Sequence, residues 1–181
     1  MFSNIPVAAR GNFPEGAEFS ARLPLPATLT IGLGYKVNEQ LTLAADVSHV
    51  GWSEYESLRF DFTKPVGGAN VSESARNYDD AYIFRLGAEY QLNDKLALRG
   101  GAYYDQTPVQ DGYLTPETPD ADSRGLSAGI GYDLSEKFSV DASFLYINKK
   151  KRTDTAEFSR GIPGTYKATA YIPGLALNYK F

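Results

Sequence analysis

Apolar and polar residues alternate along most of the chain, which predicts β-strands with one apolar and one polar face. In the first such segment Leu29, Ile31 and Leu33 fall on one face, while Thr30 and Gly32 fall on the other. Alternation with this period of two occurs in seven segments of the chain. The predicted strands lie at approximately 26–37, 41–63, 79–92, 96–106, 123–134, 138–151 and 165–181.

Three similar segments join neighbouring strands, at 34–43, 89–98 and 131–140. Each has an aromatic residue, a spacer, an aliphatic residue and three polar residues before the alternation restarts, which predicts a tight hairpin turn. The other connections are long and rich in Gly, Pro, Asp and Ser, at roughly 64–78, 106–122 and 152–164. Short turns at one end and long loops at the other are typical of outer-membrane β-barrels, whose short turns are periplasmic. Residues 1–25 are accordingly predicted to be an extracellular loop segment leading into the first strand.

Aromatic residues recur eight positions apart on the apolar face of several predicted strands. Eight residues of a tilted strand rise by roughly 20 Å, close to the spacing of the two aromatic girdles of a membrane barrel. The alternative is a soluble β-sandwich with a tyrosine-rich core, but such cores favour Val, Ile and Leu. The spacing therefore favours the barrel. The pairs are Tyr82 and Tyr90, Phe138 and Tyr146, and Tyr171 and Tyr179.

The composition argues against some classes of function and is compatible with a membrane barrel. The mean hydropathy of −0.34 does not exclude a barrel, because only alternate residues face lipid. A net charge of −4 and a pI of about 5.1 argue against nucleic-acid binding. The absence of cysteine excludes a disulfide scaffold and a thiol nucleophile within this sequence. The basic run at 149–152 is either a specific anion site or, as we expect, a strand end that meets water or anionic lipid head groups.

The polar face carries charged residues that strand pairing brings together. Pairing about the second turn places Glu89 opposite Arg99 and Arg85 opposite Tyr103, and pairing about the other turns places Asp141 opposite Gly131 and Asp46 opposite Gly32. An arginine there could bind a substrate carboxylate, or the charges could form a salt-bridge network that supports the wall. For Arg99 the network is favoured; for Arg85 the two interpretations are balanced. The predicted lumenal charge network is Asp46, Glu89 and Asp141, and the candidate ligand-binding residues are Trp52, Arg85, Arg99 and Tyr103.

No catalytic or cofactor-binding constellation is apparent, so the protein is predicted not to be an enzyme and to need no cofactor. His49, the only histidine, falls on the apolar face and is interpreted as an interfacial aromatic residue. Carboxylates at 105, 111, 117, 120 and 122 make one loop acidic, but their spacing does not match an EF-hand calcium loop. Trp52 either lines an apolar entrance or anchors a loop. Pro173 and Gly174, inside the last strand, predict a bulge or a local gap in the wall.

The last residues alternate and end on an aromatic side chain. This pattern resembles the signal that the outer-membrane insertion machinery recognises, which makes that machinery an expected partner together with outer-membrane lipids. The start of the chain has neither the basic nor the apolar region of a signal peptide, and the odd strand count favours a fragment of a longer protein. The residues of the predicted insertion signal are Leu175, Leu177, Tyr179 and Phe181.

The segments 79–90 and 96–105, followed by 107–109 and 119–124, resemble the FadL-type (OMPP1/TodX) outer-membrane transporters of long-chain fatty acids and other hydrophobic compounds. The sequence at 23–26 and at Trp52-Ser53 is similar to this family as well, so the resemblance runs in order over roughly 15–181. The family barrel has fourteen strands, and this chain resembles the last seven.

Residues 1–181 are therefore predicted to be one all-β domain, an antiparallel transmembrane β-barrel in partial form, located in the bacterial outer membrane. The resemblance implies passive transport of long-chain fatty acids or other hydrophobic compounds as part of a longer protein. The alternative is a structural or adhesive barrel whose extracellular loops bind partners.

Overall fold

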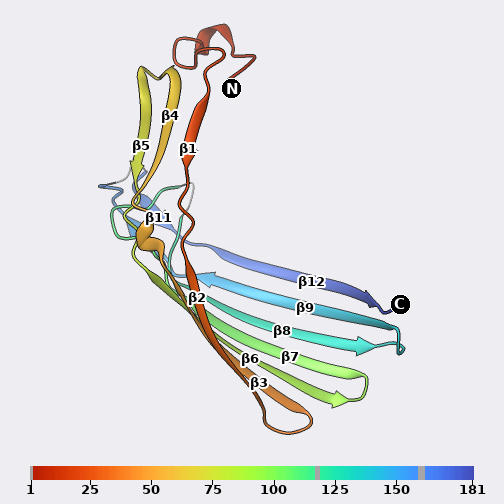
Figure 1. The fold of residues 1–181 in the computed structure, drawn as a ribbon. Coiled ribbons are helices and arrows are strands. Elements are labelled where there is room, and N and C mark those ends of the chain that lie inside the picture. Colours follow the sequence, from red (N-terminus) through yellow and green to blue (C-terminus); the bar gives the residue numbers. More distant parts are fainter. Residues whose placement is uncertain (1, 117–118, 159–161) are drawn as a thin grey trace.

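The computed structural model describes residues 2–116, 119–158 and 162–181, and its main feature is one seven-stranded antiparallel sheet (Figure 1). Each strand pairs with its neighbours in an antiparallel ladder, and there is a register irregularity between Gln91 and Asn93. In spatial order the strands are β12 (Thr169–Tyr179), β9 (Phe138–Lys149), β8 (Ser123–Asp133), β7 (Leu96–Asp105), β6 (Ala81–Asn93), β3 (Leu41–Val50) and β2 (Thr28–Lys36).

Two smaller sheets extend from the long-loop end of the main sheet. One consists of β1 (Phe19–Arg22), β4 (Ser57–Val66) and β5 (Ala69–Ala75), and the other of β10 (Arg152–Asp154) and β11 (Gly164–Tyr166). Figure 1 shows β1, β4 and β5 rising beyond the main sheet, with the N-terminus at their far end and the C-terminus near the short turns. The described residues also form two short 3-10 helices, η1 (Val7–Ala9) and η2 (Trp52–Glu54).

Strand register agrees with the pairings expected from the sequence. Glu89 pairs with Arg99, Arg85 with Tyr103, Gly131 with Asp141, and Gly32 with Asp46. The register fixes which residues share a side, because side chains alternate along a strand. We call the side that carries Asp46, Arg85 and Arg99 the polar face, and the opposite side the apolar face.

Burial is inverted relative to a water-soluble sheet. Large apolar residues are exposed all along the apolar face, including Leu33 at 75% and Leu86 at 65%. Most buried apolar side chains belong instead to the long-loop end, where Tyr55, Val109 and Leu114 are almost inaccessible. Exposed apolar area costs about 25 cal/mol per Å² in water, so this face is suited to an apolar solvent. Among the described residues, no helix has the length and apolar character needed to cross a bilayer.

The strand predicted at 41–63 is wrong, because the chain leaves the main sheet at Val50. Gly51 and η2 break the extension, and β4 then pairs with β1 and β5 instead of with β6. The apolar positions change phase here, from odd numbers in β3 to the even positions Phe60 and Phe62 in β4. The segment predicted as a loop at 64–78 therefore contains the end of β4 and all of β5, and the loop predicted at 152–164 contains β10.

The bulge predicted at Pro173 and Gly174 is absent. Pro173 pairs with Phe144 and Gly174 with Ser143, in unbroken register from Thr169 to Tyr179. Lys149 N–H donates to Ala168 C=O, and Lys180 N–H donates to Lys137 C=O, so even-numbered residues of β12 bond to β9. The nitrogen of Pro173 points to the unpaired edge of the sheet, where its missing hydrogen interrupts no existing bond.

Candidate functional site

An apolar pocket of about 500 Å³ opens at the long-loop end of the sheet, where β3 and β6 meet the loops. Its apolar wall comes from η2, from the segment before β6, and from the loop after β7. We call it the mouth pocket. The residues that form its apolar wall include Val50, Trp52, Tyr55, Tyr78, Ala81, Ile83, Pro108, Val109 and Pro119.

Three aromatic rings pack against one another on one side of the mouth pocket. The ring centroids of Tyr55 and Tyr78 are 5.3 Å apart in an edge-to-face arrangement, and those of Trp52 and Tyr78 are 5.9 Å apart. Tyr55 is only 8% exposed, so it forms the base of this cluster. Edge-to-face packing fixes ring orientation, which holds Trp52 against the pocket. Trp52 thus packs in this aromatic cluster and also lines the mouth pocket.

Asp80 ties the Trp52 segment to the start of β6. Its carboxylate accepts the backbone N–H of Ser53 at 2.9 Å, and its second oxygen lies 3.1 Å from His49 Nε2. The pKa of Asp80 lies below its ordinary value, first because of the Ser53 backbone N–H, then because of a hydrogen bond with the Ser53 side chain, and to a smaller extent because of His49. His49 also packs on Tyr82, with 5.0 Å between ring centroids.

Acidification is expected to loosen the Trp52 segment. Because the pKa of Asp80 is lowered from 3.8, its stabilising hydrogen bonds are fully present above about pH 4 and are lost as pH falls through the depressed pKa. Amide hydrogen-exchange protection at Ser53 should therefore stay high from neutral pH down to about pH 4 and fall only at lower pH. The Asp80→Asn variant should show low protection throughout. Equal protection of Ser53 in this variant and in the unsubstituted protein at neutral pH would contradict this role for Asp80.

Charged side chains line the opposite side of the mouth pocket. Lys149, at the end of β9, forms an ion pair with Asp120, whose carboxylate also accepts the Thr107 hydroxyl at 2.7 Å. Asp105 contributes a further carboxylate to the wall. The mouth pocket thus combines an apolar wall, which can hold an apolar chain, with one ammonium group and two carboxylates, and an acidic ligand group would compete with Asp120 for Lys149.

Ile83 lines the mouth pocket, and Arg85 is the next residue of β6 on the polar face, further from the long-loop end. Its guanidinium donates to Asp46 at 2.7 Å and to the Ser48 hydroxyl at 3.0 Å. Ser48 in turn exchanges a hydrogen bond with Thr30 at 2.8 Å. Arg85 is therefore paired, yet 44% of its side chain remains exposed.

Arg99 links four strands across the polar face. Its Nε donates to Glu89 and its Nη1 to Asp141, both at 2.6 Å, and Asn178 donates to the second oxygen of Asp141 at 2.8 Å. The guanidinium crosses β8 above Gly131, where an added Cβ would lie 2.8 Å from Nη1 and 2.7 Å from the Asp141 oxygen. Glycine at 131 thus leaves the space that this ion-pair network occupies.

Tyr103 covers a second glycine of β8. Its ring lies across Gly125, because a Cβ there would be 1.9 Å from Tyr103 Cε1. Tyr103 is opposite Arg85 in register, but its ring covers β8. The four predicted ligand-binding residues are therefore not one cluster: Trp52 lines the mouth pocket, Arg85 and Tyr103 follow below it, and Arg99 lies near the short turns. The apolar wall residues Tyr55 and Tyr78 had no sequence signal beyond their type.

Three carboxylates of the acidic loop bind other groups of the protein. Asp111 pairs with Arg152 at 2.9 Å, Asp120 pairs with Lys149, and Asp122 accepts the Thr107 N–H at 3.1 Å. In 2–116, 119–158 and 162–181, no three acidic or histidine side chains gather as a metal site would require. Position 117, which the sequence analysis included in this loop, lies outside the described residues.

The predicted insertion signal lies on the last edge strand. Leu175, Leu177 and Tyr179 project from the apolar face of β12 with 58–73% exposure, and the Tyr179 and Phe181 rings meet edge-to-face at 5.4 Å. A larger hollow, of about 680 Å³, lies at the short-turn end of the sheet. Its lining is mainly charged and polar turn residues such as Asp94, Lys137 and Lys180, which suit it less to an apolar ligand than the mouth pocket.

Comparison with known proteins identifies the sheet as part of a larger barrel. The family model described as "Outer membrane protein transport protein (OMPP1/FadL/TodX)" matches residues 4–181. The 47 kDa outer membrane protein of Pasteurella multocida is 32% identical over 159 residues, which cover 88% of this chain and 36% of that protein. The long-chain fatty acid transport protein of Escherichia coli O6:H1 is 28% identical over 164 residues, covering 90% of this chain and 36% of that protein.

A solved structure agrees with the fold. The crystal structure of a Pseudomonas aeruginosa FadL homologue superimposes with a TM-score of 0.75 at 25% identity, covering 89% of this chain and 37% of that one. The chain thus spans little more than a third of the length of these proteins, and its seven strands are a part of a transmembrane β-barrel. It belongs to the OMPP1/FadL/TodX family of outer-membrane transport proteins.

Proposed function

We propose that this chain contributes the C-terminal half of a fourteen-stranded barrel that carries hydrophobic compounds passively across the outer membrane. In this proposal the polar face lines the lumen, the apolar face contacts lipid, and the long loops, with residues 1–25, are extracellular, as is general for such barrels. The mouth pocket would then be a capture site at the extracellular end of the lumen. Below it, the polar face of β6 offers a path past Arg85 and Gly87 toward the short turns.

The observation that carries the substrate proposal is the combination of an aromatic wall with a cation in one pocket. Trp52, Tyr55 and Tyr78 would pack against an alkyl chain, and Lys149 would attract a carboxylate at the pocket edge. Arg85, with 44% of its side chain exposed, lies next along the strand. Long-chain fatty acids have both features, and the Escherichia coli relative is named for their transport. Neutral hydrophobic compounds would use the aromatic wall alone.

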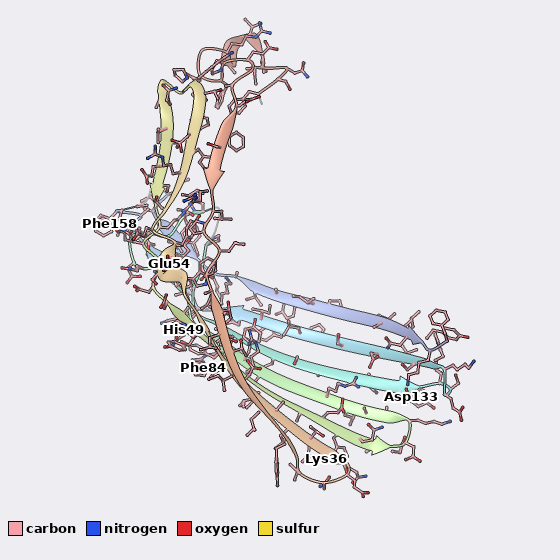
Figure 2. All side chains as sticks on the ribbon, viewed as in Figure 1. Lys36, His49, Glu54, Phe84, Asp133 and Phe158 are labelled. Carbon is pink, nitrogen blue, oxygen red and sulfur yellow. The ribbon has the colours of Figure 1, made fainter. Side chains whose placement is uncertain are left out.

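The test is uptake of a labelled long-chain fatty acid by cells whose only transporter of this family is the intact natural protein. The Trp52→Ala variant should lower uptake several-fold at limiting substrate, because it removes stacking area from the pocket, and should approach normal uptake at saturation. Phe158→Ala is the matched control. Phe158, which is labelled in Figure 2, has its ring centroid 5.3 Å from that of Tyr113 and is not one of the residues that line the mouth pocket.

A second variant separates the two substrate classes. The double substitution of Lys149 by Met and Asp120 by Asn removes both charges of the ion pair at the pocket edge. It should reduce uptake of a fatty acid but leave uptake of an alkane of equal length unchanged. If Trp52→Ala leaves both uptakes unchanged at limiting substrate, the mouth pocket is not the capture site.

One observation favours a structural or adhesive role as the second candidate. Sheet β1–β4–β5 presents an aromatic face, with Phe19 lying 5.8 Å from Phe60 and 6.5 Å from Phe62 between ring centroids. Phe19 is 52% exposed. Exposed aromatic surface on an extracellular extension suits contact with another surface. Normal adhesion combined with lost uptake after deletion of the natural gene would exclude this role, whereas the reverse outcome would support it.

We also propose that β12 presents the insertion signal to the barrel insertion machinery. Its free edge and the aligned side chains of Leu175, Leu177 and Tyr179 support this role. An edge strand offers unpaired backbone groups with which another strand can pair.

A further inference from the structure

Three cations lie at the long-loop end of the apolar face, on adjacent strands. Along β9, Phe144, Tyr146 and Asn148 share the apolar face, so Lys150 is next on that side. Lys150 N–H donates to Asp122 C=O at 2.8 Å, which continues the ladder with β8 and fixes this orientation. Arg124, on β8, is opposite Asn148.

Lys167 is the third cation of this group. Thr169 pairs with Asn148, and Lys149 N–H donates to Ala168 C=O at 2.9 Å, so Lys167 lies just beyond the end of the ladder between β9 and β12. Lys150 and Lys167 line the wall of the same small cavity. Like charges that lie close together repel, and an anion between two such lysines would offset this repulsion.

The neighbouring carboxylates have other partners. Asp120 forms its ion pair with Lys149, Asp111 pairs with Arg152, and Asp122, which is across the ladder from Lys150, accepts the Thr107 N–H. Within 2–116, 119–158 and 162–181, neither Lys150 nor Lys167 has an ion pair or a side-chain hydrogen bond, and both are exposed. The local charge is therefore unbalanced on the positive side.

A small cavity joins the two lysines. It has a volume of about 190 Å³ and lies where β9 ends and β12 begins, with Lys149, Lys150 and Lys167 in its wall beside Tyr166. Among the described residues, Asp120 is the only carboxylate in this wall, and it is paired with Lys149, which leaves the ammonium groups of Lys150 and Lys167. The cavity thus has the charge and the position to take an anionic group from the surface of the sheet.

Aromatic rings lie just below these cations on the same face. Tyr146 and Tyr171 are 5.3 Å apart between centroids, and the guanidinium of Arg124 lies 5.9 Å above the Tyr104 ring. Aromatic side chains of membrane proteins gather at the level of the lipid head groups. Cations immediately beyond such a belt face the head groups themselves.

We propose that Arg124, Lys150 and Lys167 form a binding site for the phosphate groups of lipid head groups in the leaflet around the long-loop end. The site rests on the membrane placement proposed above, but it takes no part in capture of the transported compound. The lipid would bind with its acyl chains along the apolar face near Tyr146 and its phosphate between the two lysines.

The test compares lipid retention by the intact natural protein in discs of phosphatidylcholine that contain a minor fraction of phosphatidic acid. Native mass spectrometry measures the phosphatidic acid that remains bound after release from the disc. The Lys150→Gln, Lys167→Gln double variant should retain it roughly thirtyfold less tightly, since each lysine near an anionic head group contributes to binding. The matched control is Lys95→Gln with Lys137→Gln, two lysines of the short turns, which should retain it as the unsubstituted protein does.

Inorganic phosphate distinguishes a lipid site from a site for a free anion. Because a lipid is also held by its acyl chains, excess phosphate should leave most of the phosphatidic acid bound. Equal retention by the two double variants, or complete displacement by phosphate, would overturn the proposal. Fatty-acid uptake by the Lys150→Gln, Lys167→Gln variant should stay normal, so a failure of the transport proposal would be detected separately through Trp52→Ala.

Discussion

Arginine in place of Leu86 is expected to destabilise the folded protein in a bilayer by about 2–4 kcal/mol, the cost of a cation on the lipid face near the membrane midplane. Leu86 is on the apolar face of β6, four residues from Tyr82 on one side and from Tyr90 on the other, and is 65% exposed. It therefore lies midway between the two aromatic positions. Urea unfolding of the intact natural protein from phospholipid vesicles measures this loss.

The neighbouring residue provides the control for this substitution. Gly87 is on the polar face, and a Cβ there would meet nothing closer than the Gly100 carbonyl oxygen at 4.0 Å. Arginine at Gly87 would extend into the lumen and should change the free energy of unfolding by less than about 1 kcal/mol. A similar loss for both variants, or for neither, would contradict the assignment of lipid to the apolar face.

Removal of Arg99 is expected to produce the second largest loss of stability. Arg99→Met leaves Glu89 and Asp141 without their shared cation, and the two carboxylates, which extend over β7 and β8 from either side, then repel. Because these side chains are about one third to one half exposed, the loss should be about 1–2 kcal/mol, well below that of a buried ion pair. The measurement is again urea unfolding from vesicles.

A double-mutant cycle separates repulsion from lost packing. Glu89→Gln in the Arg99→Met background should restore part of the stability, because it removes one of the two unpaired carboxylates. The same change in the presence of Arg99 should destabilise the protein. If Glu89→Gln has the same effect in both backgrounds, the network contributes no coupling energy and the Arg99 side chain acts only through its packing.

Alternation and turn position were enough to predict the main sheet. Once the three short turns were placed, counting away from each turn gave the facing pairs, so Glu89 and Arg99 were placed together without any structure. This works because a strand has a period of two and a tight turn fixes the register. The bridge from Arg99 to Asp141 was not predicted, since it spans an intervening strand and depends on the missing side chain at Gly131.

The extension beyond the membrane band was not predicted for a related reason. Alternation continues through β4, but nothing within a strand says which neighbour it pairs with. The phase change of the apolar positions between Val47 and Phe60 was visible, and a strand of 41–63 is far longer than the roughly ten residues that cross a bilayer. These two signals together place the break near Gly51.

The mouth pocket depends on contacts between segments far apart in sequence. Trp52 was selected for its residue type, and the structure places it in the wall of this pocket. Tyr78 and Val109 reach the pocket from loops that have no periodic pattern from which their positions can be calculated, and Lys149 reaches it from the end of β9. Loop conformation is set by particular hydrogen bonds, such as the one from Ser53 to Asp80.

The position of Pro173 has a consequence for assembly. Any strand that joins the free edge of β12 meets backbone N–H groups at Tyr171 and Leu175 but none at Pro173 between them. The pairing between β12 and such a strand therefore lacks one hydrogen bond at its middle, compared with a full ladder. In a closed barrel, we expect this pair of strands to separate before the other pairs.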